Sequence, residues 1–291
     1  MVHKIRPRAV WNIAVGTLIK WITNPRIIIA AVLLVFMKTL AIDPLLERVD
    51  KIGEPLNCLE PFIAVGNSGM LVMFMPCVFL ILISDFPNMG GNTVFYIHRT
   101  GKLNWFLGQV LFLIMSIFLY LTALLLGCAA MSGGKISTEW SDAVSKYSAV
   151  TFEETGTFVS ELIPSNLYNQ MSVLNAALHT FILLALYMLL LALVLCLMKL
   201  LYLRIAGLFA VYTIIAFGVL TCSLKVEAMW LFPMANTLVW LHYRELLRKP
   251  ITPVSDSFIY FAVLIGTLLA ANLLVLRKLQ FTNQEVEEAS C

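Results

Sequence analysis

The chain has 291 residues, of which 60% are hydrophobic and 13% are charged, and its formal net charge is +3. Soluble globular chains carry about 45–50% apolar and about 25% charged residues, so this composition excludes a soluble domain. The apolar runs are too long and alternate too little for barrel strands, and we predict an all-α integral membrane protein.

The first predicted element is an amphipathic elbow helix over residues 8–24. Its positions separate onto two helical faces, Trp11, Val15, Leu18 and Ile22 on one and Arg8, Asn12, Gly16 and Lys20 on the other. Such a helix is expected to lie in the membrane interface, with its tryptophans at headgroup depth. Asn24-Pro25 then ends it and turns the chain into the membrane. The alternative is that this segment simply extends the first span.

Six membrane spans follow, because crossing the hydrocarbon core takes about 17–25 helical residues. We place them at 26–42, 61–83, 106–131, 174–198, 201–224 and 258–276, in a single transmembrane domain over 1–291. A loop at 84–105 separates the second and third spans, and longer loops lie at 132–173 and 225–257.

The distribution of charge predicts the orientation. With the N-terminus inside, the cytoplasmic segments hold eleven basic and four acidic residues, and the other side holds nine and thirteen. Lysine and arginine accumulate on the cytoplasmic side of helical membrane proteins. We therefore expect both termini and the loop 84–105 to be cytoplasmic, and 132–173 and 225–257 to be extracytoplasmic.

The loop 84–105 is short, mixed and aromatic. Its centre, "NTVFYIHR", is compatible with a short helix beneath the membrane. A loop surrounded by solvent has little reason to gather Phe86, Met89, Phe95 and Tyr96, whereas a surface that docks into a partner's groove does. The alternative is that these aromatic side chains anchor in lipid headgroups.

The order of elbow helix, first span, and second span ending in this loop resembles the membrane subunits of type-2 ABC exporters. The segment "YIHRTGKLNWFLGQVL" is similar to the family's arginine, glycine, tryptophan and small-residue pattern at the start of the third span. The resemblance implies that the loop is a coupling helix seated on a cytoplasmic ATPase. Its contact residues would be Phe86, Asn88, Met89, Phe95, Tyr96, His98 and Arg99. The family's acidic residue beside the coupling helix is commonly glutamate, whereas the nearest acid here is Asp85.

The last extracytoplasmic loop carries "EAMWLFPMANTLVWLHYRELLRKP". The resemblance implies a short re-entrant helical hairpin that dips into the outer leaflet before the last span. The alternative is an amphipathic helix resting on the outer surface.

The sequence lacks the motifs of several enzyme and nucleotide-binding classes. No G-x-x-x-x-G-K-[ST], H-E-x-x-H or G-x-S-x-G is present, and no cysteine pattern indicates a metal site or a disulfide framework. We therefore expect no catalytic residue, no metal and no cofactor in this chain, with ATP and Mg²⁺ held by a partner ATPase. No nucleic acid is expected as a partner.

The resemblance also implies a substrate pathway between two membrane subunits, lined by their second and fifth spans. Its polar positions here would be Asn67, Ser68, Thr213 and Thr221. Polar groups at that depth are costly against lipid and should face protein or a cavity. Packing inside the chain is the alternative for all four.

The predicted function is that of an exporter subunit in a bacterial plasma membrane, moving a hydrophobic or amphipathic cargo outward. Antimicrobial peptide, lipid and drug stay open as cargo, and the second membrane subunit would be identical or homologous. The alternative is a non-transporting immunity or sensory subunit that binds a peptide at its outer loops.

Overall fold

The structure, a computed structural model, describes residues 5–69, 71–87, 92–146, 162–244 and 250–278. These residues are mostly helical, with isolated β-bridges and no strand among them. Five helices in this part of the chain are long and apolar enough to cross a membrane, at Pro25–Ile52, Lys102–Ser132, Val173–Leu200, Arg204–Ser223 and Val254–Lys278. The chain is thus an all-α, multi-pass membrane protein.

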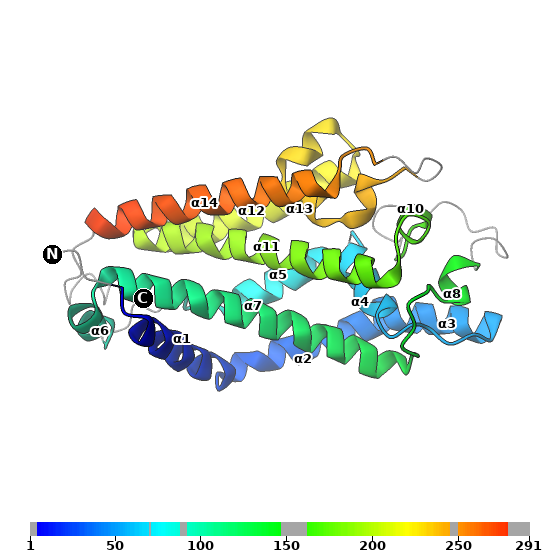
Figure 1. Cartoon of the computed structure of the whole chain (residues 1–291), viewed down its shortest axis with the longest axis horizontal. Coiled ribbons are helices and arrows are strands. Elements are labelled where there is room, and N and C mark those ends of the chain that lie inside the picture. Colours follow the sequence, from blue (N-terminus) through cyan, green and yellow to red (C-terminus); the bar gives the residue numbers. More distant parts are fainter. Residues whose placement is uncertain (1–4, 70, 88–91, 147–161, 245–249, 279–291) are drawn as a thin grey trace.

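The long helices run side by side along one axis (Figure 1). Helix α11 (Val173–Leu200) contacts α4 (Glu60–Asn67), α7 (Lys102–Ser132), α12 (Arg204–Ser223) and α14 (Val254–Lys278). Its apolar window is 56% buried, against 22% in α14. A helix that is apolar on all sides can be surrounded by other helices. This property is consistent with the central position of α11 in the bundle.

The elbow segment forms helix α1 (Pro7–Ile22), which ends before Asn24. The Asn24 side chain accepts a hydrogen bond from the backbone N–H of Arg26 and so caps the 3-10 turn η1 (Pro25–Ile27). Helix α1 packs along α7, where Gly108 gives it room to approach. Trp21 is buried, so this tryptophan contacts protein and not headgroups.

The first span is longer than the predicted 26–42. Helix α2 (Ile28–Met37) continues through the π-helical turn η2 (Lys38–Ile42) into α3 (Asp43–Ile52). The apolar run does end near Ile42, but the helix ends only at Gly53, whose φ of 83° lies in the left-handed region. Pro44 lies just after the π-helical turn and lacks the backbone N–H that a residue inside a helix would donate.

The predicted second span, 61–83, consists of two helices. These are α4 and α5 (Leu71–Leu82), which are bent by 86° relative to each other, and they count as a sixth crossing only if the two are taken together. Helix α4 ends where Gly66 lets the backbone meet Thr180 of α11 without a Cβ between them. The end of α4 is therefore packed closely against α11.

The segment before the last span is broken into short helices. These are η3 (Glu227–Leu231), α13 (Pro233–Thr237) and η4 (Val239–His242). Residues 233–242 are buried, and α13 packs against α11, α12 and α14. This segment is therefore packed into the helical bundle, and its placement relative to the outer leaflet stays a prediction.

The described ends of the chain lie together. Helix α1 begins, and α14 ends, at the end of the bundle that carries α6 (Asn92–Thr100), whereas α3, α8 (Asp142–Ser145) and α10 (Ser165–Tyr168) lie at the opposite end (Figure 1). We refer to these as the α6 end and the opposite end.

Candidate functional site at the α6 end

Helix α6 presents an exposed aromatic residue. The Phe95 side chain is 74% exposed, while Ile97, two residues further on, is buried on the face that packs toward α7. His98 and Arg99 are exposed. Gly101, with φ 88°, then makes the turn from α6 into α7. The predicted contact residues Phe95, His98 and Arg99 thus lie on one short helix and are accessible.

Other predicted contact residues behave differently. Asn88 and Met89 lie outside the described residues, as does the side chain of Tyr96. Phe86 is only 3% exposed, and its ring centroid lies 6.2 Å from that of Phe112 on α7. Phe86 therefore fixes the loop to the bundle and has no surface to offer a partner.

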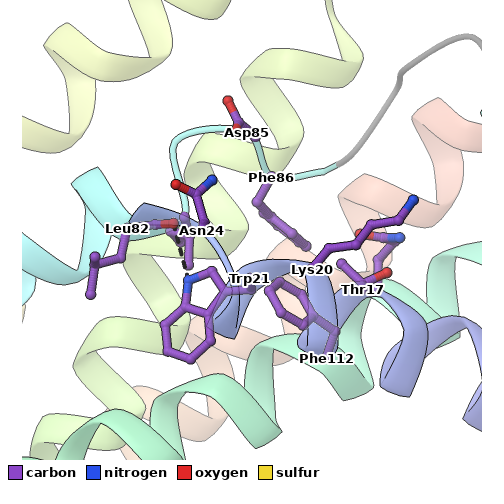
Figure 2. A pocket seen from close by; sticks show the side chains of 10 residues that line it. Thr17, Lys20, Trp21, Asn24, Leu82, Asp85, Phe86 and Phe112 are labelled. Atoms are coloured by element: carbon purple, nitrogen blue, oxygen red, sulfur yellow. Dashed lines mark hydrogen bonds between the residues drawn. The ribbon is translucent and has the colours of Figure 1, made fainter. Parts of the chain in front are cut away.

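A cavity of about 90 Å³ lies beneath this loop. Its walls come from α1, the end of α5, the loop and α7 (Figure 2). Trp21 and Phe112 meet there with ring centroids 6.4 Å apart, and the Trp21 Nε1–H donates to the carbonyl of Leu82 at 3.0 Å. That bond satisfies one of the carbonyls that the end of α5 leaves without a helical partner.

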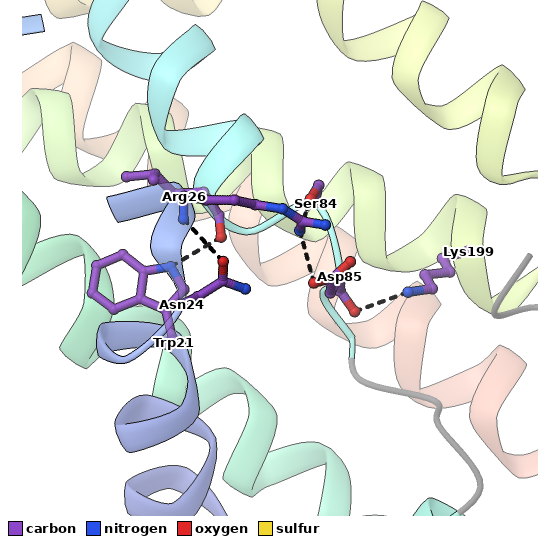
Figure 3. A network of polar contacts seen from close by, with 7 residues as sticks. Trp21, Asn24, Arg26, Ser84, Asp85 and Lys199 are labelled. Carbon is purple, nitrogen blue, oxygen red and sulfur yellow. Dashed lines mark hydrogen bonds and ion pairs between the residues drawn. The ribbon is translucent and has the colours of Figure 1, made fainter. Parts of the chain in front are cut away.

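The loop is also held by charged side chains (Figure 3). Arg26 Nη1 donates to Ser84 Oγ at 2.7 Å and pairs with Asp85 Oδ2 at 2.8 Å. Lys199, near the end of α11, donates from Nζ to the backbone carbonyl of Asp85 at 2.9 Å. The loop after α5 is therefore tied to η1 and to α11 at one residue.

These two ties differ in strength. Both partners of the Arg26–Asp85 pair are exposed by about 40% or more, and exposed ion pairs contribute roughly 0–1 kcal/mol. Lys199 is only 6% exposed, so its ammonium depends on the Asp85 carbonyl for a hydrogen bond away from water. If the hydrogen bond between Lys199 and the Asp85 carbonyl is broken, a buried ammonium group is left without an acceptor.

A third tie joins the start of α1 to the junction of α6 and α7. Asn104 is fully buried, its Oδ1 accepts from the backbone N–H of Arg6 at 2.9 Å, and its Nδ2 donates to the carbonyl of Thr100 at 2.7 Å. The predicted site residues do not include Arg26, Lys199 or Asn104. The sequence does show that Lys199 and Arg26 are basic residues at the ends of apolar runs. Basic residues at such positions indicate which side of the membrane a loop lies on, and do not by themselves indicate a functional contact.

The predicted pathway residues do not form one surface. Asn67 is fully buried, and its Nδ2 donates to Thr180 Oγ1 at 2.8 Å while its Oδ1 accepts from the backbone N–H of Val239 at 3.0 Å. Trp240 Nε1 donates to the Asn67 carbonyl at 2.9 Å. These bonds favour the packing alternative for Asn67.

The remaining predicted pathway residues have different surroundings. Ser68 is buried beside Asn67, whereas Thr213 is exposed on α12. Thr221 donates its hydroxyl to the carbonyl of Phe217 at 2.8 Å, within its own helix. Hydroxyl bonds of this kind satisfy a polar side chain without a cavity.

Within the described ranges, no group of three or more His, Cys, Asp or Glu side chains is placed to hold a metal ion. The chain matches no protein-family profile, no curated protein and no solved structure. The exporter family therefore stays a resemblance, carried by the residues quoted above.

Proposed function

We propose that the chain is the transmembrane subunit of an ATP-binding-cassette exporter, with α6 as its coupling helix. The observation that carries this proposal is the outward placement of Phe95 on a short helix that is otherwise held by the bundle. Ile97 and Gly101 set α6 against α7, which leaves Phe95 available to a partner. Exposed aromatic residues that fill a partner's pocket are typical binding hot spots.

The ties of the neighbouring loop supply a route for mechanical coupling. A displacement of the loop acts on α5 through the chain, on η1 through Arg26 and on α11 through Lys199. ATP and Mg²⁺ would be bound by a separate ATPase subunit, and the energy of hydrolysis would reach the membrane helices through these contacts. The cargo class we propose is hydrophobic or amphipathic, a peptide, lipid or drug.

The proposal includes a second membrane subunit, identical to this chain or homologous to it, and two ATPase subunits. Closed two-fold pairing is the common arrangement when subunits are identical. A mass measurement of the active complex in nanodiscs tests this assembly. A fully active single membrane subunit would contradict it.

The decisive experiment replaces Phe95 with alanine. Loss of a hot-spot residue commonly costs about 2 kcal/mol or more, so affinity for the ATPase should fall roughly thirtyfold. The measurement is co-purification of an ABC ATPase, identified by mass spectrometry, together with the ATPase rate that the membrane subunit stimulates. Adding Tyr96→Ala extends the test along the same helix.

The matched control is Ile136→Ala, which shortens an exposed apolar side chain at the opposite end and should leave association unchanged. If Phe95→Ala alters only membrane seating, the aromatic side chain is a headgroup anchor and the coupling assignment is wrong. If wild-type protein binds a peptide at its outer loops and no ATPase accompanies it, the immunity or sensory function takes its place.

A further inference from the structure

The cavity beneath the loop has one polar corner and several aromatic walls. Trp21, Phe86 and Phe112 form the apolar side, and Thr17 and Lys20 of α1 lie at the other side (Figure 2). Gln109 of α7, Asn24 and Asp85 also line it, and the Asp85 carboxylate is paired with Arg26. A pocket of this kind, apolar with a few convergent polar groups, is typical of small-ligand sites.

Gln109 carries the argument, because its amide lacks a partner. The side chain is 2% exposed, and its Oε1 has no hydrogen-bond partner among the described residues. Buried polar atoms are nearly always hydrogen-bonded, and an exception calls for a bound group that supplies the missing partner. Thr17 cannot supply it, since its hydroxyl proton is already donated to the carbonyl of Ile13 at 2.8 Å.

Lys20 adds a positive charge at the same cavity. It is exposed and forms no ion pair within the part of the chain that the structure describes. Arg26 is already paired with Asp85 at 2.8 Å, which leaves Lys20 to meet an anion at this cavity. Basic groups gathered at one end of a membrane protein attract anionic lipid.

The size of the cavity limits the ligand. Pockets that hold a whole drug-sized ligand measure about 300–1,000 Å³, so about 90 Å³ admits only a small polar group of a larger molecule. The rest of that molecule would lie outside, where Ile19 and Ile22 of α1 are exposed. A small polar head, a negative charge for Lys20 and apolar chains outside describe a phospholipid.

We propose that this cavity binds the headgroup of an anionic phospholipid, with its phosphate on Lys20 and a headgroup hydroxyl on Gln109. A hydroxyl suits Gln109 in either orientation of the amide. The hydroxyl can donate a hydrogen bond to the amide oxygen, and it can accept one from the amide nitrogen if the amide is flipped. Phosphatidylglycerol has this chemistry. The lipid would brace α1 against α7 and the loop, and this inference does not depend on the exporter proposal.

The test measures lipids retained on the purified full-length protein. Protein is reconstituted in nanodiscs of phosphatidylcholine and phosphatidylethanolamine with a minority of phosphatidylglycerol, released, and analysed by native mass spectrometry. Wild-type protein should retain phosphatidylglycerol selectively. Lys20→Ala and Gln109→Met should each lower that retention about tenfold, because each removes a hydrogen bond to the headgroup.

Arg8→Ala is the matched control, since it removes one exposed charge from the same helix without touching the cavity. Lys20 is exposed, so Lys20→Ala keeps the fold and gives a result even if Gln109→Met does not fold. Equal retention in Lys20→Ala and Arg8→Ala would overturn the site, as would equal retention of all three lipids. Displacement of the lipid by soluble glycerol 3-phosphate would identify a free phosphate ester as the ligand and overturn the assignment to lipid.

Discussion

At the scale of single residues, Asn67 shows how one side chain joins three elements. It bonds to Thr180 of α11 and to Val239 of η4, while Trp240 caps its carbonyl. A buried amide in this position satisfies the end of α4 and holds the short helices of the last loop. Its role is to hold the end of α4 against α11 and η4.

Replacement of Asn67 by alanine should lower the free energy of unfolding by on the order of 2 kcal/mol, because it leaves the Val239 N–H and the Thr180 hydroxyl with fewer partners. Thermal unfolding in detergent measures the change. Asn12→Ala, at an exposed asparagine of α1, is the control and should have little effect. Equal midpoints for the two variants would contradict the structural role of Asn67.

His242 gives the opposite end a dependence on pH. Burial lowers the pKa of His242 from its usual 6.5, although the bond of Nδ1 to the Thr252 carbonyl at 2.8 Å acts the other way. The unfolded chain therefore binds a proton before the folded chain does. The contribution of neutral His242 to the free energy of unfolding is complete above about pH 6.5, and it declines as the pH falls below that value.

We expect the thermal midpoint to fall between pH 7 and about pH 5.5, with part of that fall removed in His242→Asn. Midpoints measured in detergent across this range check the prediction. A pH dependence that is identical in wild type and variant would show that another group is responsible.

At the scale of elements, the position of α1 depends on close contact with α7. A Cβ on Gly108 would lie 2.7 Å from Ile13 Cγ2 and 3.1 Å from the carbonyl of Val10, so a side chain there must displace α1. Gly266 of α14 has open space at the same position of its side chain. The two glycines form a natural pair for comparison.

Gly108→Ala should destabilise the protein by about 1–3 kcal/mol through overpacking between α1 and α7. Gly266→Ala should be neutral or stabilise it by about 0.5–1 kcal/mol, since alanine favours the helix. Thermal unfolding of both variants, with limited proteolysis of the α1 region, tests this. A similar effect of the two substitutions would mean that α1 does not need its close approach.

At the scale of the whole molecule, the beginning of α1 and the end of α14 lie at the same end as α6 (Figure 1). The charge pattern of the sequence predicts that this end is cytoplasmic. Helix packing places these three segments at one end of the bundle, and the lysine and arginine counts independently assign them to one side of the membrane.

Impermeant maleimide labelling in a background without the six native cysteines tests the orientation. Ile136→Cys should label in intact cells, and Arg99→Cys only after permeabilisation. Both positions are exposed, so access by the reagent depends on the side of the membrane. Labelling at position 99 from outside would reverse the topology and remove the basis of the exporter proposal.

Much of the architecture was predictable because it depends on local properties. The thickness of a bilayer sets the length of an apolar helix, so the predicted spans at 106–131, 174–198 and 258–276 lie within helices that extend at most four residues beyond them at either end. Asn24-Pro25 marked the end of α1 because proline and an asparagine cap act on the adjacent turn. The helical class and these boundaries were determined by the sequence alone.

Only the tertiary structure decided which side chains of the site are available and which are structural. Phe86 and Phe95 are equivalent by residue type, yet one packs on Phe112 and the other is exposed. Asn67 meets Thr180 across 113 positions and Val239 across 172, and Lys199 meets Asp85 across 114. Such contacts arise only when the whole bundle assembles, because burial and hydrogen-bond partners depend on neighbours in space and not on neighbours along the chain.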